Sequence, residues 1–170
     1  MCMHLRPLPQ ACAWLDECIS HERLKNVRVI KKGLYSTDTE LELQVAGHGD
    51  VHGAHSTLRE DWYVTHNNER ITIELTHLDR YAKSRGIDSI RFWKLDVEGS
   101  EYDALKGAEG LLESKRIDAL YIEMNNPTES EIPGYLFDHG YISMTVDRRG
   151  VATPKNARIK EAGDYLFLLS

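Results

Sequence analysis

The sequence predicts a single α/β domain with a largely parallel sheet, and two observations support this prediction. Segments with the period of a strand alternate with segments of helical period over the second half of the chain. At 170 residues with 41% hydrophobic content, the chain is long enough for one compact domain and too short for two. Residues 1–170 are therefore expected to form a single domain.

The first half of the chain contains one helix and three strands by this reasoning. Apolar residues at helical spacing predict an amphipathic helix over Pro9–Ser20, and Val27–Ile30 reads as a strand. Polar and apolar residues alternate over Glu40–Val45 and again over Arg70–Leu75, which predicts an antiparallel pair. A polar excursion, Ala46–Glu69, separates the two.

The second half shows the regular alternation of strands and helices. A short helix is predicted over Thr76–Arg85 and a buried strand over Ile90–Val97. Ser100, followed by Asp103, resembles a capping box and predicts the start of the next helix. The remaining elements are a strand at Ile117–Met124, a helix at Glu129–His139, and closing strands at Tyr141–Val146 and Asp164–Leu169.

Charge and composition exclude several classes of partner. The formal net charge is −6 and the basic residues are scattered, which argues against nucleic acid. The three cysteines, Cys2, Cys12 and Cys18, form no C-x-x-C pair and indicate reduced thiols. No apolar run approaches the length of a bilayer span. We expect a soluble cytoplasmic protein without a membrane partner.

One segment concentrates the residues that could carry chemistry. Asp96 and Glu98 follow the predicted buried strand, and ligands of open α/β sheets bind at the carboxyl ends of strands. Strand alternation places Lys94 on the same face as Asp96, and Glu98 joins them if the extended conformation persists. Gly99 permits a backbone angle that a side chain would block. A purely structural alternative pairs Asp96 with Lys94 and places Glu98 at the positive end of a helix dipole.

Four short segments resemble the FkbM family of methyltransferases, whose core reads L-D-x-Y, K-x-D-V-E-G-x-E, L-x-G-A and I-E. They are Leu78–Tyr81, Lys94–Glu101, Leu105–Ala108 and Ile122–Glu123. The resemblance implies a Rossmann-like class I methyltransferase fold, with S-adenosylmethionine bound across the carboxyl ends of its first strands. It further implies an O-methyltransferase acting on a hydroxyl of a small molecule or sugar.

The resemblance also implies roles for individual residues. Asp96 is the first candidate to touch the methyl donor or to accept the proton of the hydroxyl, and Glu98 is the second. Glu123 could orient the substrate or Lys94. Tyr35 and Ser36, just past a strand, correspond to the region that faces the adenine ring. A turn that merely ends the strand is the alternative for these two residues.

The sequence departs from the family pattern at its start. Only five residues precede Arg6, so we expect the fold to lack its first strand and glycine-rich loop. Arg6 stands where the family has a glutamate that holds the ribose, and a guanidinium offers no acceptor. We therefore expect no measurable binding of S-adenosylmethionine by these residues alone. Three explanations for the missing first strand and loop are open: a reading frame that starts too late, an inactive remnant, or completion by another polypeptide.

The alternatives to an O-methyltransferase are an interaction module without donor binding and a metal-assisted hydrolase. Loss of a central strand would expose two sheet edges and favour self-association. His48, His52 and His55, with Asp50, have ligand-like spacing, but the intervening glycines favour a solvated loop. Asp96 and the segment 123–126 could hold Mg²⁺, although strand-end Asn residues are commonly turn formers. No metal site is predicted.

Overall fold

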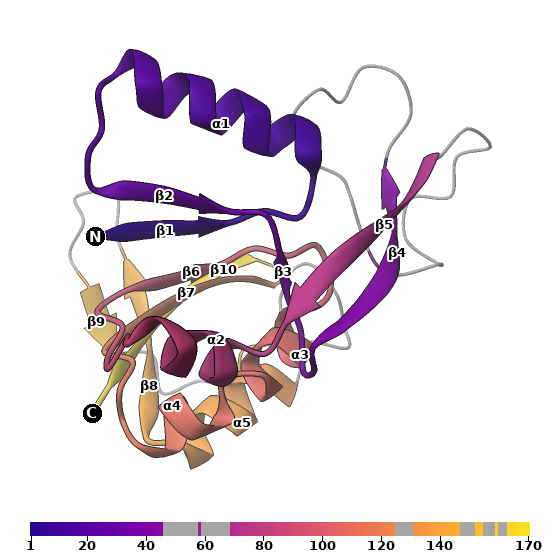
Figure 1. Ribbon diagram of the computed structural model, residues 1–170. Helices are drawn as coiled ribbons and strands as arrows, with labels where there is room; N and C mark the ends of the chain where they lie inside the picture. The colour runs from indigo at the N-terminus through magenta and orange to yellow at the C-terminus, as the bar shows by residue number, and fades with distance from the viewer. Residues whose placement is uncertain (46–57, 59–68, 125–130, 147–151, 155–158, 160–162) are drawn as a thin grey trace.

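Three separate β-sheets and five helices make up the described part of the protein. The computed structural model describes residues 1–45, 58, 69–124, 131–146, 152–154, 159 and 163–170. Figure 1 shows a two-stranded sheet with one helix above it, a five-stranded sheet with the other helices below it, and a three-stranded sheet at one side. No helix among these residues is long and apolar enough to span a bilayer.

The two-stranded sheet contains the first strand of the chain. β1 (Cys2–Leu5) lies parallel to β2 (Val27–Ile30), and α1 (Pro9–His21) connects them. The predicted helix at residues 9–20 and strand at 27–30 are confirmed. Proline at the start of α1 suits a position whose N–H needs no partner. β1 was not predicted, because its sequence, Cys-Met-His-Leu, lacks the β-branched residues that mark β2.

The three-stranded sheet confirms the predicted antiparallel pair. β4 (Thr39–Val45) and β5 (Glu69–Thr76) pair in register from Thr39 opposite Leu75 to Val45 opposite Glu69. β3 (Gly33–Leu34) joins the other side of β5 in parallel. Alternate apolar side chains of the pair pack against the start of α1. This smaller core consists of Leu8, Ala11, Leu43, Val45, Ile73 and Leu75.

The five-stranded sheet has mixed strand directions, so the expectation of a largely parallel sheet is wrong. Its order is β6-β7-β10-β8-β9, formed by β6 (Trp93–Leu95), β7 (Ala119–Met124), β8 (Tyr141–Val146), β9 (Ala152–Pro154) and β10 (Gly163–Leu169). β6 and β7 are parallel, whereas β10 runs antiparallel to both β7 and β8, and β9 antiparallel to β8. The last three strands follow each other at short intervals, and short connections favour antiparallel pairing.

The helices beneath this sheet differ from expectation at one glycine. α3 (Glu101–Lys106) and α4 (Glu109–Glu113) replace the single helix expected after Ser100. They separate at Gly107, where an added Cβ would collide with the carbonyl oxygen of Tyr35. Leu105 of α3 and Leu112 of α4 are fully buried together with Ile122 of β7 and with Ile132 and Leu136 of α5 (Glu131–Asp138). The chain therefore needs glycine here so that α3 can approach the turn after β3.

Asp79 fixes the position of α4 from a neighbouring helix. It lies in the first turn of α2 (Leu78–Arg85). Its carboxylate accepts hydrogen bonds from the N–H groups of Gly110, at 2.7 Å, and Leu111, at 2.9 Å. The first N–H groups of a helix have no partner within it. Asp79 thus acts as a cap for α4 supplied by a distant segment.

Candidate functional site

The turn that follows β6 has an uncommon backbone. Glu98 has a φ of 51° and Gly99 a φ of 97°, both in the left-handed region. The prediction that Gly99 adopts a conformation suited to glycine is confirmed. Glu98 does not continue the strand, so the extended geometry considered from the sequence ends before it. A positive φ is uncommon for a residue with a side chain, so surrounding contacts must hold this turn.

Glu101 supplies those contacts. Its side chain is almost fully buried, with 2% exposure. One carboxylate oxygen accepts the N–H of Val97 at 2.9 Å, and the N–H of Gly99 lies 3.0 and 3.3 Å from the two oxygens. Hydrogen bonds to a charged acceptor are stronger than neutral ones. Glu101 therefore stabilises the left-handed turn from the first position of α3.

The predicted capping box is wrong. Ser100 occupies the cap position of α3, but its side chain makes no capping hydrogen bond. Its backbone, with φ −111° and ψ 19°, lies outside the extended region that lets a capping hydroxyl reach the first turn. The helix begins where the sequence predicted, and Glu101 rather than Ser100 organises its start.

Lys94 and Asp96 lie on one face of the strand end, as predicted, and form the ion pair that the structural alternative expected. The Lys94 ammonium group donates a hydrogen bond of 2.8 Å to Oδ2 of Asp96. This bond raises the pKa of Lys94 above its ordinary value, and the carboxylates of Glu123 and Asp164 act in the same direction. Because the side chains are 56% and 27% exposed, the pair contributes at most about 1 kcal/mol to stability. Its main effect is to fix the orientation of the Asp96 carboxylate.

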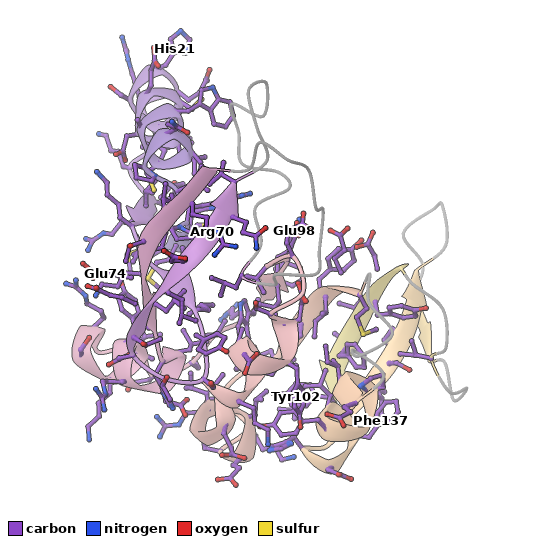
Figure 2. All side chains as sticks on the ribbon, turned by 90° about the vertical axis from the view of Figure 1, so that its right-hand side faces the viewer. His21, Arg70, Glu74, Glu98, Tyr102 and Phe137 are labelled. Atoms are coloured by element: carbon purple, nitrogen blue, oxygen red, sulfur yellow. The ribbon has the colours of Figure 1, made fainter. Side chains whose placement is uncertain are left out.

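A cavity of about 560 Å³ brings the four predicted catalytic residues together. Lys94, Asp96, Glu98 and Glu123 all line it, with His4 and other residues of β1 on its opposite side. Figure 2 views the molecule from the right-hand side of Figure 1. It shows Glu98 far from Tyr102 and Phe137. A volume of this size is typical of sites for small molecules. The strand end is therefore a candidate active site.

His4 and Glu101 belong to the candidate site but were not assigned to it from the sequence. Burial lowers the pKa of His4, and the charges of Arg6 and Lys94 add to the effect, which favours a neutral imidazole. Arg6 also lines the cavity. No sequence signal marks His4, because β1 was not recognised as a strand. Glu101 belongs to the quoted motif, yet only the folded turn reveals its bonds.

Tyr35 and Ser36 lie next to the cavity and are not among its lining residues. The preceding residues, Gly33 and Leu34, do line it. Ser36 instead forms a side-chain hydrogen bond with Asp103 of α3, and this bond opposes the rise in the Asp103 pKa that burial causes. Burial also raises the pKa of Tyr35. Contact of these two residues with an adenine ring stays a prediction.

Six of the metal candidates considered from the sequence fall outside the described residues, namely His48, Asp50, His52, His55, Asn125 and Asn126. Asp96 and Glu123, the carboxylates of the Mg²⁺ candidate set, are described and line the cavity. Within the described residues, Glu109, Glu113 and His139 place their ligand atoms within 4.8 Å of one another. Both glutamates are exposed, and none of the three lines the cavity. This cluster is separate from the candidate active site.

Comparison with known proteins places this geometry in a family. The model of the methyltransferase FkbM domain matches residues 4–143. The fold is similar to the crystal structure of methyltransferase FkbM from Methylobacillus flagellatus KT, with a TM-score of 0.57 and 18% sequence identity. That similarity covers 98% of this chain and 36% of the other, so the chain spans about a third of that relative's length. No curated protein matches the sequence. Since the family match includes both the turn after β6 and the carboxylates around it, the chain belongs to the FkbM methyltransferase family.

Proposed function

We propose that the protein transfers the methyl group of S-adenosylmethionine to a hydroxyl of a small molecule or sugar. The observation that carries this proposal is the convergence of Asp96, Glu98 and Glu123, with Lys94, in one cavity of a methyltransferase-family chain. Methyl transfer to oxygen requires an aligned hydroxyl and an acceptor for its proton. Carboxylates at the end of a buried strand can provide both.

The net charge of the cavity suits a cationic donor, whereas Arg6 offers no acceptor to the donor's ribose. Three carboxylates, Asp96, Glu98 and Glu123, face two cations, Lys94 and Arg6, around a cavity of about 560 Å³. With a neutral His4 imidazole, these five charged side chains leave a formal excess of one negative charge. Negative potential in a partly enclosed site favours a sulfonium ion. The donor, when bound, supplies an electrophilic methyl carbon.

Asp96 is the residue best placed to take the proton. Lys94 engages its Oδ2 atom, so Oδ1 is the oxygen that can accept a hydrogen bond from the substrate hydroxyl. With donor and acceptor bound, the Asp96 carboxylate would take up the proton that the hydroxyl releases on methylation. Glu98, which the left-handed turn holds at the cavity, is the second acceptor.

The test measures transfer of labelled methyl groups from S-adenosylmethionine to a panel of small-molecule and sugar acceptors. Asp96→Asn should lower turnover by about 10²-fold without changing the unfolding midpoint, since it removes a positioned base. Asp88→Asn is the matched control, because Asp88 is exposed and does not line the cavity. Equal turnover of both variants would return Asp96 to a structural role.

The acceptor chemistry is tested separately. Transfer to an acceptor whose hydroxyls are replaced by hydrogen would contradict a hydroxyl nucleophile. These residues alone are expected not to bind the donor, so calorimetry is repeated on a version of the protein extended upstream. If neither form binds the donor and no acceptor is labelled, the proposal fails. The chain would then be a non-catalytic module that keeps the family fold.

A further inference from the structure

A set of three metal-binding side chains lies among the helices, away from the cavity. Glu109 and Glu113 belong to α4, and His139 follows the end of α5. Each of them places a ligand atom within 4.8 Å of the other two. Figure 1 shows both helices beneath the five-stranded sheet, and none of the three residues lines the cavity. The set is therefore independent of the candidate active site.

The two carboxylates of this set repel each other. Residues four apart on a helix lie on the same face, so Glu109 and Glu113 are neighbours on α4. Like charges at this spacing destabilise a helix. Among the residues that the structure describes, neither carboxylate forms an ion pair. A bound cation would convert this repulsion into attraction.

His139 is oriented as a metal-binding histidine is. Its Nδ1 atom lies 2.7 Å from the carbonyl oxygen of Tyr135. A carbonyl only accepts hydrogen bonds, so in the neutral ring Nδ1 carries the proton and Nε2 keeps the lone pair that a metal ion needs. Such a bond to a backbone carbonyl commonly fixes the tautomer and the ring orientation of a ligating histidine.

The backbone that carries His139 is attached to the end of α4. The ammonium group of Lys115 donates a hydrogen bond to the carbonyl oxygen of His139. Lys115 follows Glu113 by two positions, so this bond connects the segments that carry the imidazole and the carboxylates. The ring of Tyr135 also lies against the imidazole, with 4.4 Å between the ring centroids. The three ligands are therefore supported by contacts that do not involve their own ligand atoms.

A buried hydroxyl beside the carboxylates is an observation independent of the three ligands. The hydroxyl oxygen of Tyr135 is buried and has no hydrogen-bond partner among the described residues. Buried polar groups usually have a partner. Burial raises the pKa of Tyr135, and the charges of Glu109 and Glu113 raise it further, so the protonated hydroxyl lies near both. A carboxylate that is drawn inward to an ion can accept this proton, and ligating carboxylates are typically hydrogen-bonded in this way.

The donor atoms and their spacing favour Zn²⁺. Ca²⁺ and Mg²⁺ prefer oxygen ligands only, whereas Zn²⁺ binds imidazole nitrogen together with carboxylate oxygen. Bonds of about 2.0–2.1 Å in a tetrahedron place neighbouring ligand atoms about 3.3 Å apart. Separations of no more than 4.8 Å must therefore shrink by at most about 1.5 Å. Both glutamate side chains are exposed, so rotation about their side-chain bonds can supply this movement.

We propose that Glu109, Glu113 and His139 form a Zn²⁺ site that links α4 to the end of α5. Three protein ligands leave one position of the tetrahedron to water. The bound ion neutralises the two carboxylates and stabilises the contact between the two helices. The proposal does not depend on methyl transfer, because ion binding is measured without donor or acceptor.

The probe is Zn²⁺ alone, titrated by calorimetry into protein that has been treated with a chelator. The unchanged protein should bind the ion, and its Tm should rise by about 5 °C or more when free Zn²⁺ is about one hundred times Kd. His139→Gln and Glu113→Gln each remove one ligand. Each variant should bind Zn²⁺ at least about tenfold more weakly and lose most of the increase in Tm.

His21 and Glu22 provide the matched control, because they are an exposed imidazole and carboxylate outside the proposed site. Nδ1 of His21 lies 3.0 Å from the carboxylate of Glu22. His21→Gln should change the affinity for Zn²⁺ by less than about twofold, since two ligands alone rarely hold this ion. His52→Gln tests the histidine-rich segment in the same way and should also leave the affinity within about twofold.

Three results would overturn the proposal. They are absence of Zn²⁺ binding, unchanged affinity of both ligand variants, and a loss of affinity in His21→Gln or His52→Gln as large as that in His139→Gln. The third result would assign the ion to a different histidine. Circular dichroism checks folding, and if His139→Gln does not fold, the exposed Glu113→Gln decides.

Discussion

Replacement of Glu101 tests whether its buried carboxylate holds the turn at the candidate active site. Glu101→Ala removes the acceptor of two backbone N–H groups, those of Val97 and Gly99. Each buried donor left without a partner costs about 1–3 kcal/mol. Both donors are half-buried, so water can reach them in part and the lower half of that range applies. Loss of about 3 kcal/mol in the free energy of unfolding is expected for Ala.

Glu101→Gln separates the charge of the side chain from its shape. The amide keeps one acceptor oxygen and loses the negative charge, which should cost about 1–2 kcal/mol. In a domain of this size, 1 kcal/mol corresponds to a change of about 2–4 °C in Tm. We therefore expect a decrease of roughly 6–12 °C for Ala and roughly 2–8 °C for Gln.

Urea unfolding followed by circular dichroism, together with thermal melts, measures both variants. Glu17→Ala on the exposed face of α1 is the control and should change stability by less than about 0.5 kcal/mol. A loss below about 1 kcal/mol for Glu101→Ala would refute the reasoning. It would mean that the left-handed turn is held by other contacts.

Two further predictions concern glycine and pH. Gly107→Ala should destabilise the fold by about 2 kcal/mol or more, because its Cβ would meet the carbonyl of Tyr35. Gly134→Ala, in open space on α5, should stabilise the fold by about 0.5–1 kcal/mol. Melting temperatures of both variants equal to that of the unchanged protein would contradict both predictions. The hydrogen bond from the N–H of His77 is the largest influence that lowers the pKa of Asp38. The unchanged protein should therefore have a higher free energy of unfolding than Asp38→Asn. This difference should be complete above about pH 4 and disappear as the pH falls through the lowered pKa of Asp38, as urea unfolding at several pH values can show.

The sequence alone predicted those elements whose signal is local. α1, the antiparallel pair of β4 and β5, and the placement of Lys94 and Asp96 on one face all follow from the periodicity of a single segment or of two similar ones. The need for glycine at position 99 also follows locally, because a tight turn between strand and helix favours positive φ. The motifs around these residues were sufficient to indicate the family.

Tertiary structure decided the features that depend on residues far apart in the chain. The direction of β10 relative to β7 depends on the path of the chain between them, which the composition of neither strand records. The cavity arises because β1 and β6, about ninety positions apart, end up as facing edges. The role of Glu101 appears only when the turn before it folds back onto its carboxylate. Periodicity reports which face of an element is buried, whereas the identity of the opposing surface is settled only when distant elements pack.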